Sequence, residues 1–214
     1  MLRTNKLYHQ YKNQETINFP NLLCEVDKPT LILGKSGVGK TTLLHLLGGI
    51  IKAPPDSSVI IKDQDISQLN NKQLDAFRGK KIGIVFQKSN FIHSLRSDEN
   101  LKLYSYLSKT KFDQKRVEDI VSRLELMDKM KQFPQHLSIG EQQRLAIARA
   151  LINGPSVILA DEPTSALDDE NCENVIQLLQ EQAKLENAAL IIVTHDQRLK
   201  NYFSNQITLQ TPNL

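Results

Sequence analysis

The sequence predicts an α/β fold in which a mainly parallel sheet is covered by helices on both faces. Two observations support this prediction. Short, wholly apolar runs such as Val157–Ala160 and Leu190–Val193 alternate with segments of helical periodicity. Polar residues follow several of these runs directly, at the sheet edge where parallel strands hold ligands. The 214 residues suit a single domain, with an N-terminal antiparallel β portion and a helical insertion at about 89–136.

The expected elements alternate along the chain. Strands are predicted at 6–11, 16–19, 30–33, 59–61, 82–86, 157–160 and 190–193, and an edge strand at 207–209. Helices are predicted at 43–50, 66–77 (as one or two short pieces), 100–107, 115–130, 141–152 and 169–185. The helices between 89 and 136 make up the predicted insertion.

A glycine-rich stretch lies between the run at 30–33 and the following helix. Its spacing, a glycine, four residues and then Gly-Lys-Thr, is that of a phosphate-binding loop. Glycines let the backbone N–H groups point at a phosphate, the Lys40 ammonium can reach the β- and γ-phosphates, and the Thr41 hydroxyl can ligate Mg²⁺. The alternative is a glycine-rich turn with a surface lysine. The stretch therefore predicts a P-loop NTPase whose phosphate-binding residues are Gly34, Lys35, Ser36, Gly37, Val38, Gly39, Lys40, Thr41 and Thr42.

Three other predicted strands end at polar residues, which are Gln87, the pair Asp161-Glu162, and His195. A carboxylate at Asp161 can hold Mg²⁺ through water, and Glu162 can orient or deprotonate the water that attacks the γ-phosphate. The alternatives are two solvated acids at a strand end and, for His195, a hydrogen-bonded core histidine.

The segment Leu137–Arg144 begins a predicted helix. Ser138 with Glu141 three residues later forms a capping-box pattern. A capped helix alone would explain the pattern. A free serine hydroxyl and the Gly140 amide at a helix N-terminus can also bind an anion.

Composition and charge exclude several classes of protein. The formal charge of +3 is too small to argue for a nucleic-acid partner. The apolar runs are too short to cross a bilayer, and no secretory signal begins the sequence. Cys24 and Cys172 are far apart and outside metal-ligand spacing, which suits a reducing compartment.

The sequence resembles the ATP-binding subunit of an ABC transporter, because five features occur together and in order. They are the phosphate loop, Gln87, the segment 137–144, the run 157–168 and His195. The resemblance covers nearly the whole chain. It implies that ATP and Mg²⁺ are bound and that the catalytic residues are Glu162 as the base, His195 in contact with the γ-phosphate, and Gln87 through the metal. The metal ligands implied are Thr41, Gln87 and, through water, Asp161. DNA-repair ATPases share part of the signature but interrupt it with coiled coils, whereas only about fifty residues separate Gln87 from Ser138 here.

The resemblance also implies a head-to-tail homodimer, or a pair with a similar ATPase subunit, with two ATP molecules at the seam. Ser138 and Gly140 would reach the ATP of the other subunit, and Asp168 would line the seam. Ile139 replaces the usual glycine of the signature, and Glu141 stands where glutamine is common. Tyr11 is the first candidate for the ring that stacks on adenine and Tyr8 the second, although either could be a strand residue packed on the sheet.

Within the family, the stretches 43–49, 81–87 and 99–101 are most similar to ATPases of lipoprotein-releasing, macrolide-exporting and cell-division systems. Such a subunit is cytoplasmic, is peripheral on the inner face of the plasma membrane, and drives separate transmembrane permease subunits. A cleft between Gln87 and the helical insertion would receive a helix of that partner. Phe91, Ile92 and Leu95 are candidate contacts, but Phe91 and Ile92 fit the core of the insertion better. The alternative is a soluble ABC ATPase of iron–sulfur cluster assembly or another role outside transport.

Overall fold

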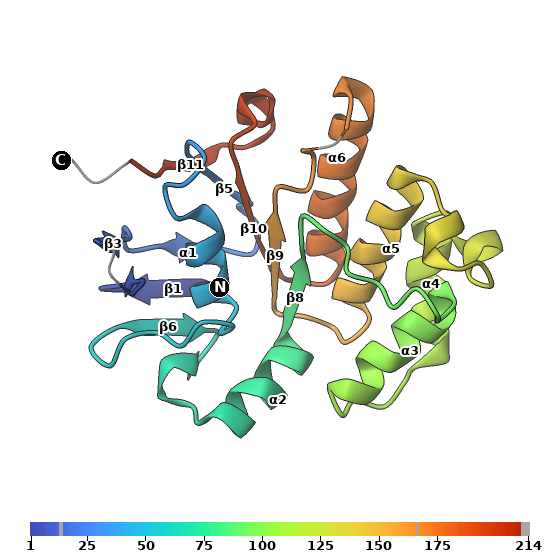
Figure 1. Ribbon diagram of the computed structural model, residues 1–214, viewed down its shortest axis with the longest axis horizontal. Coiled ribbons are helices and arrows are strands. Elements are labelled where there is room, and N and C mark those ends of the chain that lie inside the picture. Colours follow the sequence, from blue (N-terminus) through green and yellow to red (C-terminus); the bar gives the residue numbers. More distant parts are fainter. Residues whose placement is uncertain (13–14, 166, 211–214) are drawn as a thin grey trace.

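The computed structural model describes residues 1–12, 15–165 and 167–210. Its centre is a parallel sheet in the strand order β11-β5-β10-β9-β8 (Figure 1). These strands are β11 (Asn205–Thr208), β5 (Thr30–Leu33), β10 (Ala189–Thr194), β9 (Val157–Asp161) and β8 (Ile82–Val85). All four neighbouring pairs are parallel. The sequence prediction of a mainly parallel sheet with β11 at its edge is confirmed.

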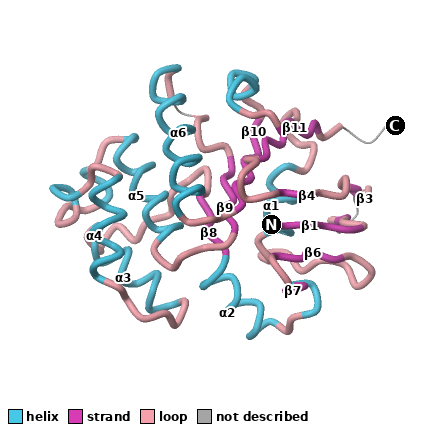
Figure 2. Tube along the Cα trace, turned by 180° about the vertical axis from the view of Figure 1, so that it is seen from behind, coloured by secondary structure: helices cyan, strands magenta, loops and turns pink. Residues whose placement is uncertain are grey.

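A second, antiparallel sheet lies beside the first (Figure 2). It comprises β4 (Leu23–Cys24), β1 (Leu2–Asn5), β6 (Ser58–Ile61) and β7 (Gln64–Asp65), and a separate hairpin joins β2 (Tyr8–Gln10) to β3 (Thr16–Asn18). The antiparallel N-terminal portion is as predicted. β1, β4 and β7 were not predicted individually, because a two- to four-residue strand is too short to establish a periodicity.

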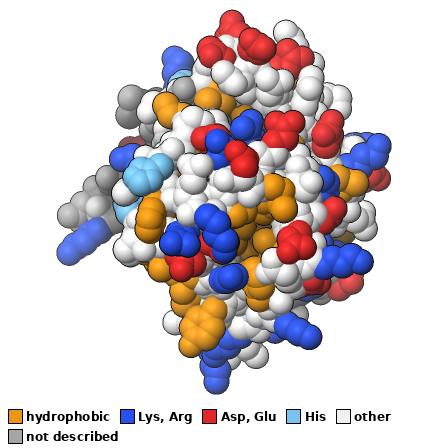
Figure 3. All heavy atoms as spheres, turned by 90° about the vertical axis from the view of Figure 1, so that its right-hand side faces the viewer, with side chains coloured by type: hydrophobic (Ala, Val, Ile, Leu, Met, Phe, Trp, Pro, Cys, Tyr) orange, Lys and Arg blue, Asp and Glu red, His pale blue; other side chains and the backbone are white. Residues whose placement is uncertain are grey.

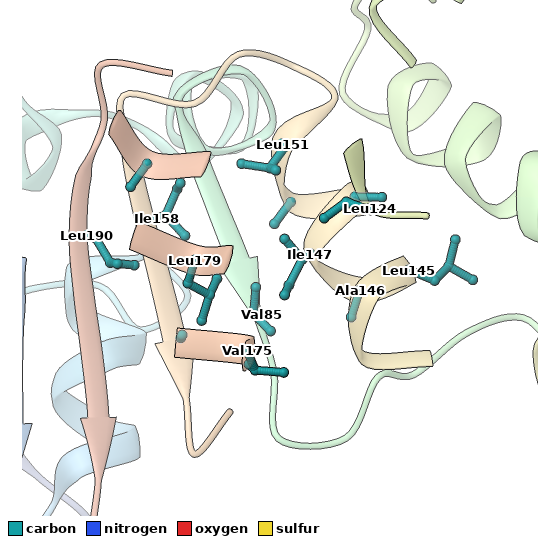
Figure 4. Packing of buried hydrophobic residues seen from close by; sticks show 14 of the residues in the cluster. Val85, Leu124, Leu145, Ala146, Ile147, Leu151, Ile158, Val175, Leu179 and Leu190 are labelled. Atoms are coloured by element: carbon teal, nitrogen blue, oxygen red, sulfur yellow. The ribbon is translucent and has the colours of Figure 1, made fainter. Parts of the chain in front are cut away.

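Helices cover both faces of the parallel sheet. Alternate strand residues enter two separate cores: Ile158 and Leu190 pack with the helices α5 (Ile139–Leu151) and α6 (Asp169–Leu185), as Figure 4 shows, whereas Leu159 and Ile191 pack with α1 (Lys40–Leu47) on the other face. This is the burial expected of a strand with both faces covered. Within the described ranges, no helix is long and apolar enough to span a membrane.

The segment between β8 and α5 is helical, as predicted. It contains α3 (Ser97–Leu107), α4 (Gln114–Arg123) and two 3-10 turns, η2 (Met127–Lys129) and η3 (Pro134–His136). The prediction of one helix over 115–130 is wrong, because Glu125 adopts a left-handed backbone with φ of 54°. The turn there buries both Leu124 and Leu126, which on a continued helix would point to different faces because they are two positions apart.

The remaining helical elements are η1 (Ile66–Gln68), α2 (Asn71–Lys81) and η4 (Gln197–Tyr202). The first two match the two short pieces predicted over 66–77. The predicted helix at 43–50 instead begins at Lys40 and ends at Leu47, where Gly48 caps it.

Phe91 and Ile92 have different environments. Phe91 is buried, with the Arg149 guanidinium 4.8 Å from its ring centroid, so its predicted core position is confirmed. The core prediction for Ile92 is wrong, since its side chain is 45% exposed. The Asn100 side chain bonds both the N–H and the C=O of Ile92, at 2.9 and 3.1 Å, and this fixes the backbone with the side chain outward. Leu95 is half-buried.

Gly83 lets α5 pack directly on β8. A Cβ added at Gly83 would lie 2.4 Å from the Ala150 carbonyl oxygen, a backbone atom that cannot move aside without shifting the helix. We expect Gly83→Ala to lower the free energy of unfolding by about 1–3 kcal/mol, measured by urea denaturation. Gly140→Ala is the matched control, because an added Cβ there meets no described atom within 4 Å. Equal urea midpoints for Gly83→Ala and the wild type would contradict this packing argument.

Candidate nucleotide-binding site

Four chain segments meet at the C-terminal edge of the parallel sheet. β5 leads into the glycine-rich loop, β8 into Gln87, β9 ends at Asp161 before Glu162, and β10 ends at Thr194 before His195. They surround a cavity of about 440 Å³. It is lined by Tyr11, Ile17, Ser36, Gly37, Gly39, Lys40, Thr41, Thr42, Gln87, Glu162 and His195. The structure thus brings together most of the residues predicted for nucleotide binding.

The loop between β5 and α1 presents a helix N-terminus to this cavity. Gly39 is the N-cap of α1 and has φ of 98°, a left-handed conformation that side chains disfavour. A Cβ at Gly39 would also lie 3.1 Å from Ile17 and 3.2 Å from Phe19. The first turn of α1 carries no acidic residue, so its positive end is free to face an anion.

Lys40 is buried, with 7% of its surface exposed. Its ammonium donates to the carbonyl oxygens of Gly34 and Lys35, at 3.0 and 3.1 Å, and lies 3.4 Å from Glu162 Oε1. These partners compensate a charge that burial would otherwise penalise. They also hold the ammonium inside the loop, within reach of any phosphate that the loop binds.

Glu162 lies at the centre of the polar network. Its carboxylate accepts hydrogen bonds from the Thr194 hydroxyl at 2.7 Å and the His195 N–H at 3.2 Å, and its Oε1 lies 2.9 Å from His195 Nδ1. Burial alone raises the pKa of Glu162, but the hydrogen bonds from His195 and Thr194 outweigh burial and bring its pKa below the usual value. The Glu162 side chain is therefore ionised at neutral pH, as a general base must be. The alternative of a core histidine is wrong, because the His195 side chain is 60% exposed.

Asp161 and its neighbours fit a magnesium ion. Asp161 is buried, and its Oδ1 has no hydrogen-bond partner among the described residues. Burial raises its pKa, and so does the charge of Glu162, while a hydrogen bond from the Thr41 hydroxyl acts in the opposite direction. Within the described ranges, no three His, Cys, Asp or Glu side chains are grouped to hold a metal. One carboxylate, a hydroxyl and the Gln87 amide suit Mg²⁺, which keeps waters and takes phosphate oxygens as ligands.

The two tyrosine candidates lie in different places. Tyr11 lines the cavity, and its hydroxyl shares a 2.9 Å hydrogen bond with Thr42 Oγ1. The His9 ring packs edge-on against it, with ring centroids 4.4 Å apart. The Tyr8 hydroxyl donates instead to Asp56 at 3.0 Å. This geometry favours Tyr11 as the aromatic contact for a base.

Some predicted residues lie elsewhere. Gly34, Lys35 and Val38 line a neighbouring cavity of about 430 Å³ rather than the first. Ser138 is exposed and caps α5: its Oγ accepts from the Glu141 N–H, and the Glu141 carboxylate accepts from the Ser138 N–H, so the predicted capping box is confirmed. Ile139 beside it is 64% exposed. Asp168 is also exposed and caps α6 through the Asn171 N–H, 2.9 Å away.

Two residues of the site were not predicted from the sequence. Ile17 lines the cavity from the hairpin, and the buried Thr194 contacts Glu162. A polar residue ending the apolar run 190–193 was the available signal for Thr194. The position of Ile17 depends on the packing of the hairpin on the loop, which no local pattern reveals.

The class of protein follows from three features at one edge of the parallel sheet. They are a glycine-rich loop at a helix N-terminus, a buried lysine and two adjacent carboxylates. The fold and site are those of a P-loop nucleoside triphosphatase.

Comparisons with known proteins identify the family. The ABC transporter family profile matches residues 18–165. The lipoprotein-releasing system ATP-binding protein LolD of Cytophaga hutchinsonii is 35% identical over 212 residues, which are 98% of this chain and 96% of that protein. LolD of Buchnera aphidicola subsp. Schizaphis graminum is 36% identical over 197 residues, 91% and 86% of the two chains.

Solved structures agree with this family. MJ0796, a bacterial ABC transporter cassette solved as a dimer, superposes with a TM-score of 0.84 at 32% identity and covers 98% of this chain and 94% of its own. The dimeric post-hydrolysis state of MJ0796, bound to ADP and Pi, gives a TM-score of 0.85 and covers 99% and 95%. The chain belongs to the ABC transporter family, as an ATP-binding subunit that hydrolyses ATP.

Proposed function

We propose that two copies of this chain close head-to-tail around two ATP molecules and that hydrolysis drives a separate membrane subunit. One observation carries the proposal: the exposed Ser138 and the half-buried Gly140 lie at the start of α5, outside the described lining of the cavity at Lys40. An anion-binding helix end of this kind supports a role on a second molecule. The dimeric MJ0796 structures, which share the fold, support the same arrangement.

Within one half of the site, the loop amides and Lys40 would hold the β- and γ-phosphates. Glu162 would accept the proton of the attacking water, and His195 would contact the γ-phosphate. Thr41, Gln87 and, through water, Asp161 would hold Mg²⁺, which when bound supplies charge neutralisation at the phosphates. Tyr11 would stack on the base.

From the other copy, Ser138 and the Gly140 amide would reach the γ-phosphate, and Asp168 would line the seam. Ile139 lies between these two contacts, and its exposed side chain would also enter the seam. ATP then favours the closed pair because it contacts both copies, and hydrolysis removes that preference.

A groove beside Gln87 would receive the membrane subunit. It has a volume of about 600 Å³ and lies between the central sheet and α3. Its apolar residues include Phe86, Tyr104 and Leu107, and its charged residues are Arg149 and the ion pair of Arg78 with Asp75. On the face that carries α3 and α4, apolar side chains are interspersed with basic and acidic side chains (Figure 3). This composition suits the apolar face of a short amphipathic helix, such as a cytoplasmic helix of a permease.

The LolD relatives favour a lipoprotein-releasing or export type of system, with this chain cytoplasmic and peripheral on the inner face of the plasma membrane. A soluble role in iron–sulfur cluster assembly is the alternative. Co-purification of a membrane protein with the tagged chain would favour the first, and co-purification of soluble partners only would favour the second.

Mixing two defective variants tests the shared site. Ser138→Arg should block the seam face, and Lys40→Ala should disable the loop, so each variant alone should have little ATPase activity. In a mixed pair, one composite site contains both substitutions and the other contains neither. We therefore expect the 1:1 mixture to regain up to about a quarter of wild-type activity, measured as phosphate release.

The control is the same mixing experiment with two preparations of Ser138→Arg, which should regain nothing. Loss of the Ser138 cap costs about 1 kcal/mol of stability, so thermal unfolding of each variant is measured first. If the mixture is no more active than its components, the two halves of a site do not come from different copies.

A further inference from the structure

We infer that the Thr194 hydroxyl positions the Glu162 carboxylate for proton abstraction, as a residue that acts through Glu162 and not on ATP. The inference rests on the proposed role of Glu162 as the base. It adds a residue that neither the signature motifs nor the lining of the cavity contains.

The direction of the hydrogen bond is fixed by the surroundings of Thr194. It ends β10, and its side chain is fully buried. Its Oγ1 lies 2.7 Å from Glu162 Oε2 and accepts the Asp196 N–H at 3.0 Å. A hydroxyl has one proton to donate and two lone pairs to accept with. The Asp196 N–H uses one of the lone pairs of Thr194 Oγ1, so the hydroxyl proton is left for another partner. The hydroxyl proton is therefore directed at Glu162, in a short bond to an ionised acceptor.

The two oxygens of Glu162 have different neighbours. Oε2 accepts hydrogen bonds from the hydroxyl of Thr194, the last residue of β10, and from the backbone N–H of His195, the next residue. Oε1 faces two side chains at the cavity, His195 Nδ1 at 2.9 Å and Lys40 Nζ at 3.4 Å. One oxygen is thus anchored by the sheet. The other lies beside groups that the nucleotide itself would engage, and it is the oxygen that would receive the proton.

The backbone of Glu162 makes such an anchor necessary. Its φ of 48° is in the left-handed region, where a glutamate needs support from its surroundings. Its N–H donates to the Val193 carbonyl at 2.9 Å. Val193 and Thr194 are neighbours on β10, so one strand end holds both the backbone and the carboxylate. A carboxylate misplaced by about 1 Å loses much of its effect on the reaction.

The valine variant of Thr194 tests the inference, because valine keeps the branched shape and removes the hydroxyl. We expect Thr194→Val to lower kcat for ATP hydrolysis by about 10- to 100-fold, the effect of one hydrogen bond to a charged group. KM for ATP should change by less than about threefold, because the loop that binds the phosphates is untouched. Thr194→Ser restores the hydroxyl and should retain most of the wild-type kcat.

A double-variant comparison distinguishes action through Glu162 from general damage. In a Glu162→Gln background, Thr194→Val should cause no additional loss of rate. Thermal unfolding and ATP binding are measured for each variant, and Thr194→Ala replaces the valine variant if the latter does not fold.

Three results would overturn the inference: a wild-type kcat for Thr194→Val, a serine variant as slow as the valine variant, or losses that multiply in the double variant. A wild-type chain that hydrolyses no ATP would instead contradict the proposed function.

Discussion

Glu162→Gln is expected to bind ATP, to hydrolyse it about 10²- to 10⁴-fold more slowly than the wild type, and to accumulate as a dimer. The amide has nearly the shape of the carboxylate and can still accept a hydrogen bond from Thr194, so the loop and the phosphates are little disturbed. It cannot accept the proton of the attacking water. ATP that is bound but not consumed then keeps the two copies together, and light scattering at saturating Mg-ATP should report twice the monomer mass.

Saturating ADP is the control for that experiment, since it lacks the γ-phosphate that Ser138 and Gly140 of a second copy would contact. The variant should remain monomeric with ADP. A Glu162→Gln chain that hydrolyses ATP at the wild-type rate would remove Glu162 from the role of base. One that stays monomeric with Mg-ATP would require the membrane subunit for closure.

Lys40→Ala is expected to weaken ATP binding by at least about 100-fold, the loss of a charge-assisted contact to phosphate in a dry site. The Lys40 ammonium is buried and already directed into the loop by the Gly34 and Lys35 carbonyls, so its removal takes away a positive charge held where the phosphates would bind. Isothermal titration with ATP and Mg²⁺ measures the change.

Lys28→Ala is the matched control for Lys40→Ala. Lys28 is also paired with an acid, Glu25 at 2.7 Å, but its side chain is 65% exposed and it precedes β5, at the opposite end of that strand from the phosphate loop. It should leave ATP affinity within about twofold of the wild type. Tight, magnesium-dependent ATP binding by Lys40→Ala would contradict the assignment of the phosphate loop.

The elements with long and regular apolar patterns were predicted from the sequence. The runs Val157–Ala160 and Leu190–Val193 are wholly apolar because both faces of the sheet are covered, and α6 was predicted with its observed bounds, 169–185. The phosphate loop was recognisable because its chemistry requires glycine and lysine at fixed spacing. Local chemistry and local spacing were sufficient for these features.

Other features depend on contacts between distant segments. Ile92 is an apolar residue of the type found in cores, but two hydrogen bonds between its backbone and the Asn100 side chain fix its side chain outward. The apolar residues from Val117 to Leu124 are spaced as on a helix, and that helix ends where Glu125 adopts a left-handed backbone. Thr194 has no motif of its own, and its importance follows from a carboxylate thirty-two residues away in the chain. Such contacts have no signature in a short window of sequence.

The separation of Lys40 from Ser138 has a kinetic consequence. If each ATP needs both, the chain in dilute solution follows a rate law that is second order in protein, and its specific activity rises with its own concentration. A membrane subunit that holds two copies replaces this dependence with a fixed effective concentration, in the millimolar range for short tethers. Turnover then becomes first order in assembled complexes, so unassembled chains consume little ATP.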